Sequence, residues 1–203
     1  MVSKDDRLFL SNWLRAPLHV GALLPSGSAL AGAMAAEVDL GRAGAVVELG
    51  AGTGPVSRAL LERGVAPENL VIIERDERFH ALLTERFPRS QVIRGDATDL
   101  RKLLADAGIE QVSAVVSGLP LLSIPFHKQQ AILRQCFSVM GAAGVLVQFT
   151  YGLRSPVPLR RLPELEVTGR PVRRVWLNLP PATVWRYTPA TAPAANWTEL
   201  ASV

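Results

Sequence analysis

One stretch of the chain, residues 46–54, constrains the fold more than any other. It reads VVELGAGTG, an apolar run that ends in three alternating glycines. This pattern is typical of a buried strand that breaks into a tight loop and then opens a helix, because glycine tolerates positive φ and lets a ligand approach bare main chain. Glu74 follows 20 residues after Gly54, at the end of a second apolar run. A carboxylate at that spacing is placed to bind a pair of ribose hydroxyls, so the pattern predicts an adenosine-binding site.

Apolar segments of strand composition alternate with helix-like or polar segments through the middle of the chain. The expected strands are 45–49, 70–74, 91–94, 112–117 and 145–149. The expected helical or polar segments are 54–63, 76–87, 99–107 and 127–140. This alternation, with its short connections, predicts an α/β fold built on a doubly wound, mostly parallel sheet.

The texture of the sequence changes after Tyr151. A loop rich in proline and arginine, 154–163, precedes two β-like runs at 164–178 and 182–188. A pair of prolines separates the two runs, and proline in sheets is confined to edges and turns. We therefore expect an antiparallel hairpin that closes one edge of the sheet.

The two ends of the chain differ from this alternating middle. Residues 7–37 read as helical apart from a break at 21–28, and the tail from 189 to 203 is rich in Ala, Pro and Thr. We expect the tail to be loosely held. The predicted organisation is an N-terminal helical extension, 1–40, followed by a cofactor-binding catalytic domain, 41–203.

Composition narrows the class of protein. The chain of 203 residues suits one domain, and its 48% hydrophobic content excludes a disordered chain. It has no apolar run of membrane-spanning length and begins without a secretory pattern. Its single cysteine, Cys136, excludes an internal disulfide and fits a reducing cytoplasm. We expect Cys136 in the core. The net charge of +4, carried mostly by arginine, reflects either compositional bias or attraction to nucleic acid or an anionic membrane.

The glycine spacing separates the possible adenosine cofactors. It is G-x-G-x-G here, whereas dinucleotide folds use G-x-G-x-x-G to hold a pyrophosphate at a helix N-terminus. Glu48, just before the first glycine, would repel a pyrophosphate. S-adenosylmethionine has no phosphate and carries an ammonium and a sulfonium, so an acidic residue beside the loop suits it. The sequence therefore predicts S-adenosylmethionine.

The next expected strand ends in Gly95, Asp96 and Ala97. Asp96 is placed to accept from the adenine amino group, while the Ala97 amide donates to the ring. Together with the glycine loop and Glu74, these residues resemble the class I methyltransferases over about residues 40–150. The resemblance implies a Rossmann-like fold and an in-line transfer of the sulfonium methyl, in which positioning supplies most of the rate.

The methyl acceptor should lie after the fourth strand, in the loop at 117–126. Methylases of nucleobase amines carry Asn-Leu-Pro-Tyr or Asn/Asp-Pro-Pro-Tyr there, so that an amide holds the amine and an aromatic ring stacks on the base. In this chain Gly118 replaces the Asn and Leu121 replaces the aromatic residue. The stacking platform is missing, and the loop suits a non-planar amine on an apolar molecule.

A helix over residues 4–16 would separate basic from apolar side chains. Its basic face would carry Lys4, Arg7 and Arg15, and its opposite face Phe9, Leu10, Trp13 and Leu14. Such a helix is either an interfacial membrane anchor or an ordinary helix packed on the domain. Periodicity alone leaves both readings open.

Further stretches resemble the small, peripheral phospholipid N-methyltransferases of bacteria. They are SNWL at 11–14, VGALLPS at 20–26, VSGLP at 116–120, QFTYG at 148–152 and VWLNLPPA at 175–182. The resemblance implies up to three methyl transfers to the amine of phosphatidylethanolamine, giving phosphatidylcholine. It also implies an N-terminal helix that docks on anionic lipid. We expect a protein that is peripheral on the inner membrane face and has no nucleic-acid partner, and a monomer, although the sequence does not determine the oligomeric state.

These patterns assign candidate roles to individual residues. For the cofactor we expect the methionine end at Gly50, Gly52 and Gly54 beside Glu48, the ribose at Glu74 with its neighbour Arg75, and adenine at Asp96 and Ala97. Ser26 either binds the cofactor carboxylate or caps a helix. For the acceptor we expect the carbonyls of Ser117, Gly118 and Leu119 and the Tyr151 hydroxyl to orient the amine, His127 or His19 to take its proton, and Arg154 to pair with the lipid phosphate.

Three other functions remain open from sequence. An RNA or DNA adenine methyltransferase would share the fold and the cofactor site, but Gly118 and Leu121 argue against it. A methyltransferase of small amines would lack the membrane helix. A non-catalytic adaptor on a decayed fold would not be expected to keep Glu48, the three glycines, Glu74 and Asp96 together.

Overall fold

The structure, a computed structural model, describes residues 25–178 and 180–190. Its helices are α2 (Pro25–Ala35), α3 (Pro55–Arg63), α4 (Glu77–Arg86), α5 (Leu100–Asp106) and α6 (Phe126–Met140). Its strands are β1 (Ala45–Leu49), β2 (Leu70–Glu74), β3 (Gln91–Arg94), β4 (Val112–Ser117), β5 (Val145–Thr150), β6 (Val167–Val175) and β7 (Ala182–Pro189). The predictions for Lys4, Arg7, Phe9, Trp13, Arg15 and His19, and for the tail beyond 190, lie outside the described residues.

In the described part of the chain, seven strands form one sheet in the order β3-β2-β1-β4-β5-β7-β6. Strands β1 to β5 run parallel, and β7 runs antiparallel to both β5 and β6. The strand order reverses between β1 and β4, which is where open α/β sheets bind their ligands. The predicted doubly wound sheet with an antiparallel C-terminal hairpin is confirmed, and Pro171 stands on β6, the edge strand where proline is tolerated.

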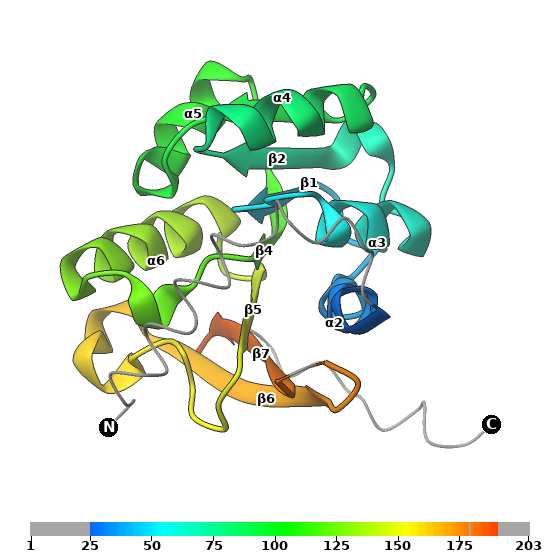
Figure 1. Ribbon diagram of the computed structural model, residues 1–203. Coiled ribbons are helices and arrows are strands. Elements are labelled where there is room, and N and C mark those ends of the chain that lie inside the picture. The colour runs from blue at the N-terminus through cyan, green and yellow to red at the C-terminus, as the bar shows by residue number, and fades with distance from the viewer. Residues whose placement is uncertain (1–24, 179, 191–203) are drawn as a thin grey trace.

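The sheet lies between two layers of helices, and each face has its own core. Residues of α2, α3 and α4, including Met34, Leu60 and Leu83, pack on one face. Residues of α5 and α6, including Leu104 and Leu133, pack on the other. Figure 1 shows α2 and α3 on one side of the sheet and α6 on the other. Because both faces are covered, the central strands are nearly continuous apolar runs, interrupted by Glu48 in β1 and ended by Glu74 in β2.

Some boundaries differ from those predicted. The first described helix, α2, already includes Pro25 and Ser26, which lie inside the break expected at 21–28. The two roles expected for Ser26, as a ligand of the cofactor carboxylate or as a helix cap, stay predictions. Strand β6 starts at Val167 instead of residue 164, because Pro163–Leu165 forms a 3-10 turn.

The parallel strands end at one edge of the sheet, and this edge positions the candidate site. The glycine loop follows β1, Glu74 is the last residue of β2, and Asp96 follows β3. The expected acceptor loop follows β4, and Tyr151 follows β5. Residues far apart in sequence are thus gathered at one end of the molecule. Among the described helices, none has the length and apolar character needed to cross a bilayer.

Candidate active site

The loop after β1 turns sharply at its glycines. Gly50, Gly52 and Gly54 have φ values of 68°, 57° and 83°, which lie in the left-handed region that favours glycine. Their main-chain N–H groups donate to the carbonyl of Ile73 at 2.9 Å, to the Glu74 carboxylate at 2.9 Å and to the carbonyl of Ala51 at 2.9 Å. The loop is therefore held by hydrogen bonds within itself and to the end of β2.

The three glycines face different surroundings. A Cβ at Gly54 would lie 2.6 Å from the Phe87 ring, and one at Gly50 would lie 2.6 Å from the Leu119 side chain. A Cβ at Gly52 would meet nothing within 4 Å. Close packing therefore explains Gly50 and Gly54, while Gly52 leaves bare main chain beside open space. We expect the ligand to approach the backbone at Gly52.

Glu74 joins the glycine loop to the next helix. Its Oε2 accepts from Gly52 N–H and its Oε1 accepts from Asp76 N–H, each at 2.9 Å. A pyrophosphate site needs free N–H groups aimed at the anion, but the glycine N–H groups of this loop are already paired and one of them holds a carboxylate. The loop therefore favours a cationic ligand over a phosphate.

Glu48 corrects one step of the sequence argument. Its side chain is 1% exposed, and the Ser57 hydroxyl of α3 donates to its Oε2 at 2.5 Å. Burial raises the pKa of Glu48 to about 8, against the opposing hydrogen bond from Ser57. At neutral pH this carboxyl is mainly protonated, so Glu48 is not the charge that repels a pyrophosphate. Glu74 supplies the carboxylate that the loop contacts.

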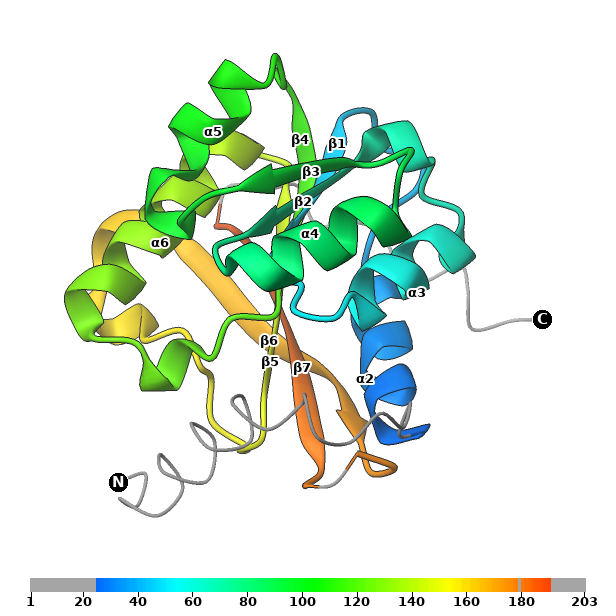
Figure 2. The same cartoon turned by 45° about the horizontal axis from the view of Figure 1, so that its top comes forward.

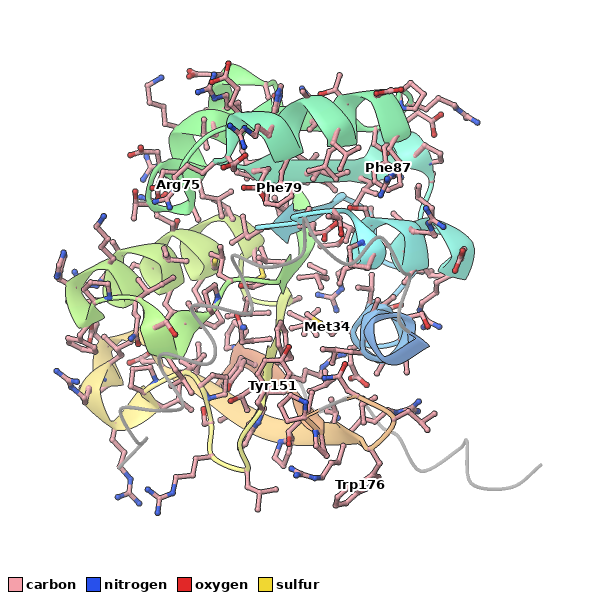
Figure 3. The ribbon with its side chains drawn as sticks, viewed as in Figure 1. Met34, Arg75, Phe79, Phe87, Tyr151 and Trp176 are labelled. Atoms are coloured by element: carbon pink, nitrogen blue, oxygen red, sulfur yellow. The ribbon has the colours of Figure 1, made fainter. Side chains whose placement is uncertain are left out.

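Asp96 forms the second acidic corner of the site. Its Oδ1 accepts from the N–H and the hydroxyl of Thr98, at 3.0 Å and 2.9 Å, and so starts the turn that contains buried Ala97. The Thr98 backbone N–H, with help from Arg75, keeps the pKa of Asp96 below its ordinary value. Arg75 reaches Asp96 Oδ2 at 3.4 Å from an exposed position that Figure 3 labels. Asp96 is therefore an ionised hydrogen-bond acceptor, as an adenine amino group requires.

The acceptor loop is pinned against the glycine loop. Gly118 N–H donates to the Leu49 carbonyl at 2.8 Å, and a Cβ on Gly118 would lie 2.7 Å from the carbonyl oxygen of Gly50. Leu119 N–H donates to the Ser117 hydroxyl at 3.3 Å. The predicted proximity of the acceptor loop to the cofactor loop is thus present, and the residue at 118 must be glycine for the two loops to approach this closely.

Sequence reasoning missed the contribution of Gln148. This buried side chain on β5 donates from Nε2 to the carbonyl of Leu119 at 2.9 Å and to that of Phe149 at 3.1 Å. Two carbonyls facing Nε2 fix the orientation of the amide, which leaves Oε1 buried without a partner among the described residues. A lone amide within the apolar strand VLVQFT was the signal that could have revealed it.

The other candidates for the acceptor side are Tyr151, His127 and Arg154. Tyr151 is half-buried and packs edge-to-face on Phe149, and burial raises its pKa to about 12 against a hydrogen bond with the Asn178 side chain. His127 is exposed in the first turn of α6, and Arg154 is exposed in the loop after β5. The structure places Tyr151 directly after β5, and the roles expected for Tyr151, His127 and Arg154 stay predictions.

Comparisons with known proteins agree with this architecture. A model of the TrkA-N domain family matches residues 50–122, from the glycine loop into the acceptor loop. A TehB-like SAM-dependent methyltransferase from Corynebacterium glutamicum is similar with a TM-score of 0.59 and 15% identity over 90% of this chain and 96% of that one. Magnesium protoporphyrin IX methyltransferase from Synechocystis PCC 6803, solved with bound SAM, is similar with a TM-score of 0.62 and 10% sequence identity. The match covers 93% of this chain and 99% of that one. At these identities the likeness shows the fold.

A curated relative is closer in sequence. The ornithine lipid N-methyltransferase of Singulisphaera acidiphila is 36% identical over 150 residues, which cover 72% of this chain and 78% of that protein. The chain belongs to the class I S-adenosylmethionine-dependent methyltransferases. The predicted cofactor, S-adenosylmethionine, is thereby confirmed. Ornithine lipid is the substrate of the relative and is not thereby shown to be the substrate of this chain.

The residues of this methyltransferase fit S-adenosylmethionine. Gly52 offers open backbone, Glu74 offers acceptor oxygens at the loop, and Asp96 offers an ionised acceptor beside Ala97. When bound, the cofactor supplies an electrophilic methyl group on a sulfonium. The assignments of methionine, ribose and adenine to these residues stay predictions. Within the described residues no three metal-ligating side chains gather in one place.

Proposed function

We propose that this methyltransferase N-methylates the amine headgroup of a membrane lipid, with phosphatidylethanolamine converted toward phosphatidylcholine. The acceptor loop carries the proposal. Gly118 leaves no space for the asparagine of nucleobase methylases, because any Cβ there would meet the Gly50 carbonyl. Leu121, at the position of their aromatic residue, is 2% exposed and packs in the core, so it offers no stacking surface. An acceptor with a planar base is therefore disfavoured.

The same loop offers features that suit an aliphatic amine. Its carbonyls are hydrogen-bond acceptors, and Gln148 on β5 holds the Leu119 carbonyl in place by a hydrogen bond from its side-chain amide. Exposed Leu122 and the half-buried side chains of Leu119 and Ile124 make the surroundings apolar. An amine attached to a lipid meets both requirements. The named relative acts on an ornithine lipid, which supports a lipid amine and leaves phosphatidylethanolamine as our more specific proposal.

The amine must arrive as a neutral nucleophile. Lipid amines are mostly protonated at neutral pH, and only the free lone pair attacks the methyl group. Desolvation beside a sulfonium favours the neutral amine, so binding beside the cofactor itself promotes loss of the proton. His127 remains the candidate base among the described residues. Arg154 remains the candidate for the lipid phosphate, which a guanidinium binds bidentately.

A labelling experiment tests the proposal. Purified protein and methyl-labelled S-adenosylmethionine are mixed with vesicles that contain an anionic lipid and phosphatidylethanolamine. Label in mono-, di- or trimethylated lipid supports the proposal and gives the number of transfers. Vesicles with phosphatidylcholine in place of phosphatidylethanolamine serve as the matched control. A second set of vesicles carries ornithine lipid in place of phosphatidylethanolamine, and label in that lipid alone would correct the headgroup. Label only in a parallel sample of total RNA would overturn lipid methylation altogether.

A further inference from the structure

Three large apolar side chains project from one end of the sheet. Leu153, Trp176 and Leu177 are 72%, 71% and 82% exposed. Leu153 belongs to the loop after β5, and the other two form the turn that follows β6. Figure 3 shows Trp176 at the outer margin of the molecule, beyond the body of the sheet. Single exposed apolar residues need no explanation, but three on adjacent segments do.

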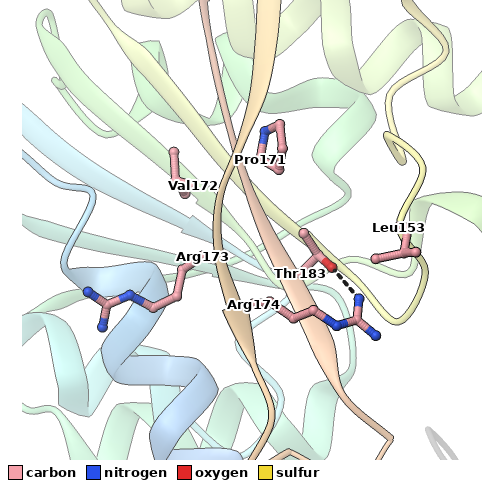
Figure 4. A pocket seen from close by; sticks show the side chains of 6 residues that line it. All are labelled: Leu153, Pro171, Val172, Arg173, Arg174 and Thr183. Atoms are coloured by element: carbon pink, nitrogen blue, oxygen red, sulfur yellow. Dashed lines mark hydrogen bonds between the residues drawn. The ribbon is translucent and has the colours of Figure 1, made fainter.

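Strand pairing brings these segments together. Thr150 at the end of β5 pairs with Thr183 of β7, and Arg174 of β6 pairs with the same Thr183 from the other side. A shallow hollow between the segments is lined by Leu153, Pro171, Val172, Arg173, Arg174 and Thr183, as Figure 4 shows. Figure 2 shows the loop after β5 and the β6–β7 turn at the same end of the molecule. We call residues 152–154 and 173–177 the hairpin end.

The hairpin end is positively charged. Residues 167–189 contain four arginines and no aspartate or glutamate. Arg154 and Arg173 are exposed and form no ion pair with any described carboxylate. Arg174 donates to the Thr183 hydroxyl at 3.0 Å and lies over the Trp176 ring, 4.6 Å from its centroid. Cationic groups thus lie beside the exposed apolar side chains at the hairpin end.

We propose that the hairpin end is a docking surface for an anionic lipid bilayer. Leu153, Trp176 and Leu177 enter the boundary between headgroups and acyl chains, while the arginines meet lipid phosphates. Tryptophan suits this boundary because its ring is apolar and its N–H is polar, and arginine stems lie along apolar surface while their heads stay solvated. Exposed apolar side chains beside arginines without carboxylate partners match the apolar interior and the anionic headgroups of such a bilayer.

The inference rests on the proposed function and adds the orientation of the enzyme to it. Gln148, which holds the acceptor loop, and Thr150, beside the hairpin end, stand on the same strand. The half-buried Tyr151, which directly follows β5, interacts with the Asn178 side chain and so joins the end of this strand to the turn after β6. An enzyme docked through this surface therefore presents the edge of the sheet that carries its acceptor loop to the bilayer.

Vesicle binding by matched variants tests the docking surface. The full-length double variant Trp176→Ala with Leu177→Ala is compared with the single variant Leu40→Ala. Leu40 is 48% exposed and precedes β1, so it lies at the end of the sheet where the parallel strands begin, opposite to the hairpin end. Sedimentation uses vesicles of phosphatidylcholine with and without phosphatidylglycerol. We expect the double variant to lose about tenfold or more in binding to anionic vesicles, and Leu40→Ala to bind like the wild type. Equal binding by all three proteins would overturn the proposal.

The charge of the surface is tested separately. Arg173→Glu should weaken binding to anionic vesicles and should not affect binding to neutral ones, and salt should reduce the difference. Arg42→Glu, an exposed residue near Leu40, is its control. Quenching of tryptophan emission by brominated lipid should fall in Trp176→Phe, which retains an aromatic side chain there. Unchanged quenching would contradict insertion of Trp176.

Activity separates failure of docking from failure of the proposed function. With a short-chain lipid amine dispersed as monomers, the double variant should retain its rate within about twofold, because no vesicle must be bound. An equal loss of rate on monomers and vesicles would place the defect in folding or catalysis and overturn a docking role. A wild type that binds vesicles through Trp176 but methylates no lipid would contradict only the proposed function. If the wild type forms a concentration-dependent dimer, and the double variant loses it but still binds vesicles, the docking proposal is overturned and this surface is a contact between two copies.

Discussion

The main-chain N–H of Gly52 donates to Oε2 of Glu74 across 2.9 Å, while the other carboxylate oxygen accepts from Asp76. One side chain at the end of β2 thereby fixes the loop after β1 and the start of α4. A carboxylate oxygen has more than one lone pair, so both oxygens keep the capacity to accept from a ribose hydroxyl. Glu74 thus organises the site and remains the candidate ribose ligand.

Glu74→Ala should weaken cofactor binding by about 10- to 100-fold, because hydrogen bonds to a charged group each contribute about 1.5–3 kcal/mol. The cofactor affinity of Glu74→Gln should lie between those of the wild type and Glu74→Ala, because the amide keeps one acceptor oxygen but presents N–H groups to the other donor. Calorimetric titration with S-adenosylhomocysteine measures both variants. An unaltered affinity in Glu74→Ala would remove the assignment of Glu74.

Gly52 and Gly54 should fail in different ways when changed to alanine. Gly52→Ala places a methyl group in open space at positive φ, so it should lower the unfolding free energy by only about 1–2 kcal/mol and reduce cofactor affinity about tenfold or more. Gly54→Ala forces a methyl group against Phe87 and should destabilise the fold by about 2–5 kcal/mol. Urea unfolding and calorimetry on both variants separate the two effects. Equal losses of stability would contradict the distinction.

The sequence predicted the sheet because its central strands are apolar runs bounded by glycine and proline, and the structure confirms their order and the closing hairpin. It also predicted that the glycine loop, Glu74, Asp96 and the acceptor loop meet, since parallel strands end at one edge. It did not predict which polar side chains are buried. Glu48 reads as a charged residue, and only its burial in the assembled fold, which outweighs the opposing hydrogen bond from Ser57, makes it mainly neutral.

The contact between Gln148 and Leu119 was equally hidden. The two residues lie 29 positions apart, and strand alternation alone does not say that an amide on β5 reaches a carbonyl after β4. The same limit applies to Gly118, whose spacing from Gly50 is set by two loops that approach each other. Local patterns identify strands and loops, whereas contacts between loops depend on the assembled sheet.

Gln148→Leu tests whether the amide positions the acceptor loop. The change removes the hydrogen bond to Leu119 together with a buried Oε1 that has no described partner, so the loss of stability should be small. Loss of one neutral hydrogen bond corresponds to about a five- to tenfold lower kcat/KM for the lipid. Cofactor affinity should not change, because Gln148 lies on the acceptor side. Wild-type kcat/KM in this variant would show that the contact is not used in catalysis.

Glu48 should make the stability of the protein fall as pH rises. Its pKa is raised from 4.5 to about 8 by burial, so between these values the folded state binds a proton that the unfolded state has released. The unfolding free energy therefore decreases with pH across this window, by at most about 1.4 kcal/mol per pH unit from this group. Below about pH 4.5 both states are protonated and the effect is absent.

Glu48→Gln removes this titration and keeps an acceptor for the Ser57 hydroxyl. Relative to the wild type, the variant should gain unfolding free energy steadily as pH rises from about 5 to about 8. Ser57→Ala removes the hydrogen bond that lowers the pKa of Glu48, so its window should extend to higher pH. Urea unfolding at several pH values measures all three proteins. Parallel stability curves for the wild type and Glu48→Gln would show that Glu48 is ionised in the fold despite its burial.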